Sequence, residues 1–454
     1  MSLSRRKFLS LAAGAGALGA AGLAACSSDR NGVASTTSAA SDGSSTTEAT
    51  STNASTTNAS TTVAPTVAPS TTAKPSPSND HVLVVVQMGG GNDGLNTLVP
   101  LDGRYHDARP TIGLADDTLV AFPGTERYGL HQALSPLSAL LAAGQIAALE
   151  AIGYPKPNRS HFAALDDWWT GTPGQASTTG WLGRWLDLTA TGDDDPLRAV
   201  ALGAGVPALA ADKSRATVVL SPKAFALKPP KGSSASLLSS LSSGAGDRRT
   251  GSGRTPTDLA DEYRASVADA AKSVATFEAL KAQKAEADAA SDNPAGGDVT
   301  QSLALAAQLI AEHHTTRVVH VTLGGFDTHA NQLATQDKLL GDIGTGIARL
   351  FTDLARTGDD KRVLLMTVSE FGRRVKENGS GGTDHGKASV QFVAGPAVVP
   401  GVYGQADLAA LNDGDLTPQL DVRSMYTLAL DWLGAPAEQI LDKRYDTLGI
   451  LRGS

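Results

Sequence analysis

The sequence predicts an α/β fold with a mostly parallel sheet that carries helices on both faces. Two observations support this class: continuous β-branched runs without polar alternation, and stretches of helical apolar spacing that separate several of them. A strand that is apolar on both sides is covered on both faces, as strands of parallel sheets are. Strands that alternate with helices along the chain are typical of such sheets.

Each predicted strand is a short apolar run. Residues 81–87 read His-Val-Leu-Val-Val-Val-Gln and precede a glycine-rich turn, which indicates a central strand. Five further strands are predicted at residues 145–152, 197–202, 317–323, 362–368 and 389–393. Apolar spacing of helical type predicts helices at residues 134–143, 163–169, 301–313, 332–356 and 422–433.

Between about residues 213 and 300 this pattern is interrupted. Loop-like Ser, Gly and Pro stretches come first, and the Ala-, Lys- and Glu-rich residues 257–290 predict one or two amphipathic helices. We expect a helical and loop insertion here, which either decorates the surface or forms a cap over a substrate site.

The N-terminus has the features of an export signal. Residues 4–9, Ser-Arg-Arg-Lys-Phe-Leu, form a twin-arginine pattern, and a mild apolar run follows that is too short and glycine-rich for a membrane span. The run ends at Leu-Ala-Ala-Cys26, which resembles a lipobox, so residues 1–26 are predicted to be a signal that leaves Cys26 lipid-modified. An ordinary exported protein with a chance cysteine is the alternative. Because Cys26 is the only cysteine, an internal disulfide is excluded.

A spacer and one large domain follow the signal. Residues 27–80 consist mainly of Ser, Thr, Ala, Asn and Pro, which cannot bury enough apolar surface to order, so we expect a disordered linker. Residues 81–454 are expected to form the folded domain. The net charge of −8 and the absence of a basic stripe or recognition motif argue against nucleic acid as a partner.

Three glycine-framed segments carry residues of metal-ligand type. They are Gly-Gly-Gly-Asn-Asp-Gly-Leu-Asn (89–96), Gly-Gly-Phe-Asp-Thr-His (324–329) and Gly-Gly-Thr-Asp-His-Gly (381–386). Turns beyond parallel strands gather at one edge of the sheet, where ligands bind. Carboxylate and imidazole together suit zinc, manganese or a similar divalent ion. We therefore expect a metal site formed from Asp93, Asp327, His329, Asp384 and His385.

Each of these segments also has a purely structural interpretation. Asp93 is as consistent with a structural turn as with a ligand. Asp327 or Thr328 could cap the following helix, although only a ligand role explains His329, which in an extended segment faces the same way as Asp327. An Asp-His pair such as Asp384 and His385 is common in exposed loops.

Two further segments add candidate residues. The segment Ser369-Glu-Phe-Gly-Arg373 ends a predicted strand. Glu370 could bind metal or orient a ligand histidine. Arg373 could hold an anionic oxygen or form a surface salt bridge. Ser160 is at a predicted helix start, where it could cap the helix or serve as a nucleophile for phosphoryl or sulfuryl transfer. His161 could be a ligand or a base.

Motifs in the same order along residues 81–452 resemble the DUF1501 family, a family of unestablished biochemical role. They include Gly-Gly-Asn-Asp-Gly-Leu-Asn-Thr (90–97), Arg-Ser-His-Phe (159–162), Gly-Trp-Leu-Gly-Arg (180–184), Gly-Phe-Asp-Thr-His (325–329), Glu-Phe-Gly-Arg (370–373), Gly-Thr-Asp-His-Gly (382–386) and Asp-Trp-Leu-Gly (431–434). The family is grouped by fold with the alkaline phosphatase and sulfatase superfamily.

This resemblance implies a three-layer αβα sandwich with a divalent-metal cluster at the carboxyl end of the sheet. By motif and chain order, the superfamily's site residues correspond to Asp93, Ser160, Asp327 with His329, and Asp384 with His385. The sequence departs from the superfamily pattern because the middle pair is closely spaced and no histidine follows His385. His161 or Glu370 would then substitute for the missing ligand.

The leading hypothesis is a lipid-anchored, metal-dependent hydrolase of phosphate or sulfate esters in the cell envelope. Ser160, His161 and Arg373 would carry catalysis; the metal would be zinc, manganese or calcium. The substrate would be a small or glycan-linked anionic ester, and the membrane partner would be reached through the lipid on Cys26. The alternatives are a non-catalytic envelope protein that binds glycans or a partner, and a structural lipoprotein.

Overall fold

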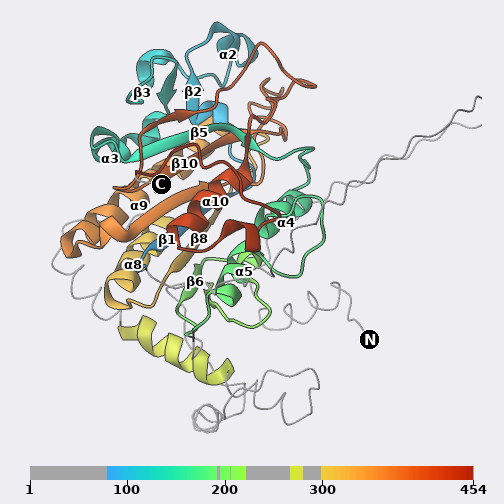
Figure 1. The fold of residues 1–454 in the computed structure, drawn as a ribbon. Helices are drawn as coiled ribbons and strands as arrows, with labels where there is room; N and C mark the ends of the chain where they lie inside the picture. The colour runs from blue at the N-terminus through green and yellow to red at the C-terminus, as the bar shows by residue number, and fades with distance from the viewer. Residues whose placement is uncertain (1–78, 192–194, 205, 221–265, 280–297, 453–454) are drawn as a thin grey trace, which may run out of the picture. The chain divides into compact units, whose positions relative to one another are not determined.

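A nine-stranded sheet forms the centre of the protein (Figure 1). The structure is a computed structural model that describes residues 79–191, 195–204, 206–220, 266–279 and 298–452. The predicted signal, the lipobox and all but the last two residues of the predicted linker lie outside these ranges. In the described part, no helix is both long and apolar enough to cross a membrane.

The sheet is parallel except for one strand. Its order is β11-β5-β10-β9-β1-β8-β6-β7, with β12 also paired to β5. The strands are β1 (Val82–Gly89), β5 (Ile146–Gly153), β6 (Ala199–Leu202), β7 (Thr217–Val219), β8 (Val318–Gly324), β9 (Val363–Val368), β10 (Ser389–Ala394), β11 (Gly401–Tyr403) and β12 (Leu420–Asp421). Strand β10 runs antiparallel to its neighbours β5 and β9. The predicted α/β class and the mostly parallel sheet are confirmed, and all six predicted strands are present.

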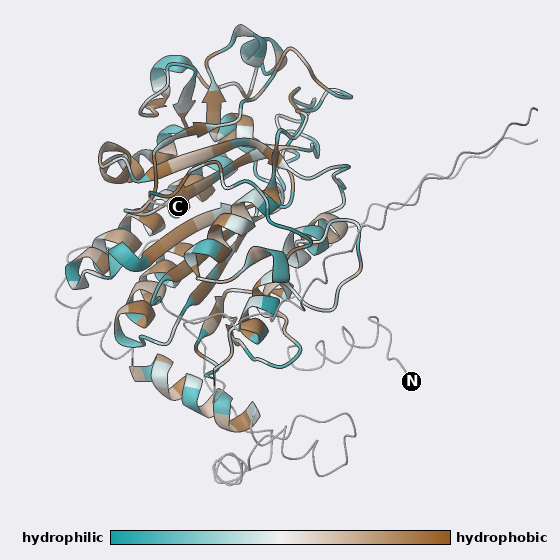
Figure 2. Cartoon of the chain, in the orientation of Figure 1, coloured by the Kyte–Doolittle hydropathy of each residue, from teal (hydrophilic) through white to brown (hydrophobic). Residues whose placement is uncertain are grey.

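Both faces of the sheet are covered, as the absence of polar alternation predicts. In β1, Val82, Val84 and Val86 belong to one apolar cluster, whereas Leu83 and Val85 belong to another. The first cluster includes side chains of α3 (Ser138–Ala142), α8 (Asp298–Glu312) and α9 (Gln332–Thr357); the second includes those of α4 (His161–Thr170), α5 (Trp181–Leu188) and α10 (Val422–Trp432). The strands are accordingly hydrophobic along most of their length (Figure 2). A fully buried Val or Leu contributes about 1.5–3 kcal/mol, so these two layers dominate stability.

Some predicted boundaries shift. The helix predicted at residues 134–143 is a 3₁₀ segment, Gln132–Leu137, followed by the short α3. Pro136 lies inside the 3₁₀ segment and has no N–H for a regular α-helical ladder. The stretch predicted to be an insertion contributes β7 to the main sheet, beside β6, and residues 266–279 are helical. Residues 221–265 and 280–297 of that stretch lie outside the described residues.

A second, small sheet has no counterpart among the predictions. It consists of β2 (Leu98–Pro100), β4 (Tyr128–Leu130) and β3 (Val120–Ala121), and the short helix α2 (Gly103–Ala108) lies between β2 and β3 in the chain. Strands of two or three residues are too short to show the periodicity from which a strand is predicted.

A glycine in α5 shows how closely this helix approaches the backbone at Ala210. A Cβ at Gly183 would lie 1.8 Å from the carbonyl oxygen of Ala210, whereas at Gly341 in α9 the nearest atom, Cβ of Ala133, is 3.9 Å away. We predict that Gly183→Ala destabilises the protein by about 1–3 kcal/mol despite alanine's better helix propensity. The matched change Gly341→Ala should stabilise it by about 0.5–1 kcal/mol. Urea unfolding would measure the free energy of unfolding of both variants. If both changes shifted this free energy in the same direction, the close approach at Gly183 would be contradicted.

The buried carboxyl of Glu150 in β5 predicts a pH-dependent stability. Neither of its oxygens has a hydrogen-bond partner among the described residues, and burial raises its pKa to about 8. Between its ordinary pKa of 4.5 and about 8, the folded state keeps this proton while the unfolded state has lost it. Stability therefore falls as pH rises through this window, by up to about 1.4 kcal/mol per pH unit.

Glu150→Gln should remove this dependence. The variant should be about as stable as the wild type near pH 4.5 and increasingly more stable toward pH 8, with no further divergence above that. Chemical unfolding at three pH values measures the difference; a constant offset between the two proteins would show that Glu150 does not titrate in this way.

Candidate metal centre

The carboxyl ends of four parallel strands and the start of β10 meet at one edge of the sheet. The chain leaves β1, β5, β8 and β9 there; because β10 is antiparallel, the loop before it arrives at the same edge. Three of the four strands, β1, β8 and β9, are direct neighbours. This topology brings together residues that are more than 200 positions apart in the chain.

Four side chains from these loops converge. Oδ1 of Asp327 lies 3.0 Å from Nε2 of His329 and 3.1 Å from Nε2 of His385, and these two nitrogens are 2.9 Å apart. Nε2 of His161 lies 3.4 Å from Oδ2 of Asp327. His161, Asp327 and His385 each place one ligand atom within 4.8 Å of the others. We call these four residues, Asp327, His161, His329 and His385, the Asp-His cluster.

The second ring nitrogen of each histidine points outward to an acceptor. Nδ1 of His161 is 2.8 Å from Oε1 of Glu370, Nδ1 of His385 is 2.8 Å from the carbonyl oxygen of Arg159, and Nδ1 of His329 is 3.3 Å from Oδ1 of Asp384. Carboxylate and carbonyl oxygens only accept, so these contacts favour the tautomer with the proton on Nδ1 in each ring. In that tautomer each ring directs an Nε2 lone pair toward Asp327. Acceptors that converge in this way repel one another unless protons or a cation lie between them.

Electrostatics keep the cluster's carboxylate charged. Burial raises the pKa of Asp327, but the hydrogen bond and positive charge of Arg373, together with the neighbouring histidine rings, lower it to about 2. A hydrogen bond from Asn378 is the main reason why the pKa of Asp384 lies below its usual value. Phe371 packs against the rings of His161 and His385, with centroid distances of 4.8 and 4.7 Å. The cluster therefore has a fixed negative charge and an apolar wall.

Glu370 orients His161 and does not face the centre of the cluster. Its side chain is 1% exposed, and Oε1 accepts hydrogen bonds from Nδ1 of His161 and from the backbone N–H of Gly90. Of the two roles that the sequence left open, the structure places Glu370 where it orients a histidine. Asp384 has the same position behind His329, although its side chain is 60% exposed.

The hydrogen bond that His161 donates to Glu370 raises the pKa of His161 above its ordinary value. We predict that Glu370→Gln lowers this pKa, because the uncharged amide stabilises the imidazolium less. A nuclear magnetic resonance titration of the metal-free protein would follow the His161 ring, with the exposed His314 as internal reference. An unchanged midpoint for His161 would show that Glu370 does not control its protonation.

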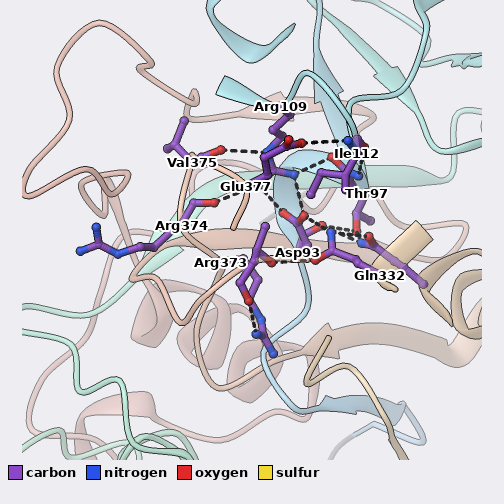
Figure 3. Close-up of polar contacts among 12 residues, drawn as sticks. Asp93, Thr97, Arg109, Ile112, Gln332, Arg373, Arg374, Val375 and Glu377 are labelled. Atoms are coloured by element: carbon purple, nitrogen blue, oxygen red, sulfur yellow. Dashed lines mark hydrogen bonds and ion pairs between the residues drawn. The ribbon is translucent and has the colours of Figure 1, made fainter. Parts of the chain in front are cut away.

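Asp93 does not join the cluster. Its side chain and that of Arg109 are both 0% exposed and form a bidentate ion pair, with N–O distances of 2.6 and 2.9 Å, and Gln332 donates a further hydrogen bond to Asp93 (Figure 3). Both carboxylate oxygens are engaged, so the geometry favours a structural role over metal binding. Arg109 also donates to the carbonyl oxygens of Val375 and Arg374, which ties the loop after β1 to the loop after β9.

Arg373 is buried and cannot present its charge to a ligand. Its side chain is 0% exposed and donates to the carbonyl oxygens of Gly90, Gly91, Phe326 and Thr383. One nitrogen also donates to Oδ1 of Asp327 at 2.7 Å. The expected contact with an anionic oxygen is therefore replaced by a positioning role: Arg373 holds the loops together and orients Asp327.

Ser160 precedes α4 and leaves its hydroxyl exposed. It occupies the N-cap position, but its side chain makes no capping hydrogen bond; its backbone N–H donates instead to Oδ1 of Asn158. The expected capping role is thus absent. The next residue, His161, belongs to the Asp-His cluster, so Ser160 is adjacent in the chain to a member of the site.

Sequence reasoning missed Arg109, Arg159 and Gln332. A buried arginine such as Arg109 has no sequence signal that separates it from a surface one. Arg159 acts through its backbone carbonyl, which every residue type provides. Only the three-dimensional arrangement shows these roles.

A protein-family model supports the assignment of the chain. The model described as "Protein of unknown function (DUF1501)" matches residues 138–446, which is more than half of the sequence. The chain belongs to the DUF1501 family. No curated protein matches this DUF1501 sequence.

Solved structures similar to this DUF1501 protein share few identical residues with it. A protein in the alkaline phosphatase superfamily from Vibrio parahaemolyticus is 7% identical, with 84% of this chain and 72% of that chain covered and a TM-score of 0.38. The lipoteichoic acid synthase LtaP from Listeria monocytogenes is 9% identical (82% and 76% covered, TM-score 0.37), and the PsFucS1 sulfatase from Pseudoalteromonas sp. is 11% identical (82% and 71% covered, TM-score 0.34). The function must therefore come from the side chains of the site itself.

Proposed function

We propose that this protein is an exported, metal-dependent hydrolase of phosphate or sulfate esters. One observation supports this above all: three imidazoles direct Nε2 lone pairs toward one carboxylate, and each is held in that tautomer by an acceptor behind it. Histidine ligands of metal ions are oriented in this way.

The residues fit a transition metal. His161, His329, His385 and Asp327 would hold the ion, and Nε2 of His161 is buried without a hydrogen-bond partner among the described residues. Three nitrogens and one oxygen suit zinc or manganese, whereas calcium prefers oxygen ligands throughout. Of the three ions expected from the sequence, zinc fits this donor set best.

A divalent ion held there would supply positive charge to an anionic ester and make a water molecule a better nucleophile. The protein's own groups would position the reactants. The exposed Ser160 hydroxyl is at the N-terminal end of α4, where backbone N–H groups and the helix dipole favour an anion. Ser160 is the candidate nucleophile, Glu370 keeps His161 in place, and Arg373 keeps Asp327 in place.

Location and partners form part of the same proposal. The twin-arginine pattern at residues 4–9 and the lipobox-like Cys26 support export and a lipid anchor in the cell envelope. Substrates would then be small or glycan-linked anionic esters of that compartment.

The decisive experiment is elemental analysis of the purified full-length protein, followed by an ester panel. 4-Nitrophenyl phosphate, bis(4-nitrophenyl) phosphate and 4-nitrophenyl sulfate would be tested as purified, after chelation, and after zinc or manganese is restored. We expect about one bound ion per chain and turnover that chelation abolishes. Folded protein that binds no metal would refute the proposal. Bound metal without turnover of any ester would favour the non-catalytic binding protein instead.

A further inference from the structure

A groove lies along the same edge of the sheet, next to the Asp-His cluster. Its volume is about 600 Å³, large enough for a sugar-sized molecule. It lies where β5 ends and β12 pairs with it. The lining residues come from the loop after β5, the loop before β10 and the segment that leads into α10: Tyr154, Pro155, Lys156, Pro157, Lys387, Asn412, Thr417, Pro418, Gln419, Leu420 and Asp421.

Two residues that line the groove are only a few positions in the sequence from histidines of the cluster. Lys387 follows His385 by two residues, and two residues span at most about 7 Å. On the other wall, Pro157 precedes His161 by four residues, and the intervening Arg159 accepts a hydrogen bond from His385. Two segments that line the groove therefore also carry histidines of the cluster, so the groove and the cluster are close neighbours at this edge of the sheet.

Two lysines give the groove a positive charge. Lys156 is exposed and has no hydrogen-bond or ion-pair partner among the described residues, and Nζ of Lys387 donates to the neutral Asn412, at 2.9 and 3.1 Å. Asp415 lies close enough to Lys387 to interact with its charge, but this carboxylate is already paired with Arg159 and Arg374. The groove's acidic residue, Asp421, is already paired with Arg423 at 2.7 Å and caps α10. On a chain with a net charge of −8, this excess of positive charge is local.

The walls of the groove are stiff. Pro155, Pro157 and Pro418 have fixed φ angles. The hydroxyl of the buried Tyr154 accepts a hydrogen bond from the backbone N–H of Asn158, which closes the loop after β5. Lys156, between two of these prolines, has a φ of +56° that non-glycine residues rarely adopt. A rigid site loses less entropy when a ligand binds.

We propose that this groove binds the non-reacting part of the substrate and that this part carries a second anionic group. The inference rests on the proposed function and makes the substrate an ester of a sugar-sized molecule with a further phosphate, sulfate or carboxylate. Lys156 and Lys387 determine this specificity, because they recognise the second anion and do not touch the reacting ester.

Binding to the metal-loaded, full-length protein tests the inference without requiring turnover. Fructose 1,6-bisphosphate and fructose 6-phosphate differ by one anionic group, and calorimetry gives the ratio of their dissociation constants. We expect the wild type to prefer the bisphosphate by at least about tenfold, since a charge-assisted contact contributes roughly 1.5–3 kcal/mol. Lys156→Gln and Lys387→Gln should each lower this preference by about fivefold.

Two further variants make the result specific. Lys361→Gln, an exposed lysine at the opposite end of β9, should retain the full preference. Thr417→Trp fills the groove and should weaken the binding of both sugars.

The outcomes separate the inference from the proposed function. No preference in the wild type, or a preference that survives both lysine changes, overturns the inference even if esters are hydrolysed. A lysine-dependent preference in a protein that hydrolyses no ester supports the groove and rejects the hydrolase.

Discussion

Asp327→Asn should greatly weaken the binding of the metal ion. Asp327 is the single carboxylate that faces all three histidines of the Asp-His cluster, and its low pKa keeps it charged at every working pH. Changes to residues that only orient ligands already cost roughly 10–100-fold in metal affinity, so loss of this ligand should cost more than about 100-fold. Competition with a chromogenic chelator would measure the affinity, and ester hydrolysis should fall in parallel.

Asp384→Asn is the matched control for this change. Asp384 contacts His329 from behind and is 60% exposed, so its loss should weaken metal binding by only about tenfold. If Asp327→Asn bound metal as well as the wild type while Asp384→Asn did not, the two carboxylates would have the opposite roles.

Arg109→Leu should be among the most destabilising single changes in the described structure. The change leaves the carboxylate of Asp93 charged, buried and without its main partner. Breaking a buried pair from one side costs about 3–5 kcal/mol. Urea unfolding monitored by tryptophan fluorescence would give the difference, and Arg109→Leu combined with Asp93→Asn should recover part of it.

Arg104 provides the comparison within the same segment. It pairs with Asp102, but its side chain is 58% exposed. Arg104→Leu should therefore cost no more than about 1 kcal/mol. Equal losses for Arg104→Leu and Arg109→Leu would show that the buried pair does not hold the loops after β1 and β9 together.

Much of the scaffold was predictable because its signals are local. Residues 81–87, 317–323 and 362–368 are apolar on both faces, and this requires a strand covered on both sides. The 3₁₀ segment at Pro136 and the two-residue strands β3 and β12 were missed because they are too short or too irregular for a periodic pattern.

The candidate site was predictable in composition but not in the roles of its members. Chain order and glycine-rich turns pointed to Asp327, His329 and His385, and these do converge. His161 was named as a possible substitute for the missing histidine, and it completes the cluster. Asp93 and Arg373, chosen by the same reasoning, are each buried in contacts of their own.

The sequence by itself determined the class of the fold, the edge at which the chemistry-bearing residues gather, and their types. The tertiary structure alone decided which of them face one another. A carboxylate in a glycine-rich turn has the same sequence signal whether it meets a histidine or an arginine; the partner comes from a distant strand, and burial then fixes the pairing. Asp327 therefore meets three imidazoles and Asp93 meets Arg109, although the two carboxylates follow neighbouring strands.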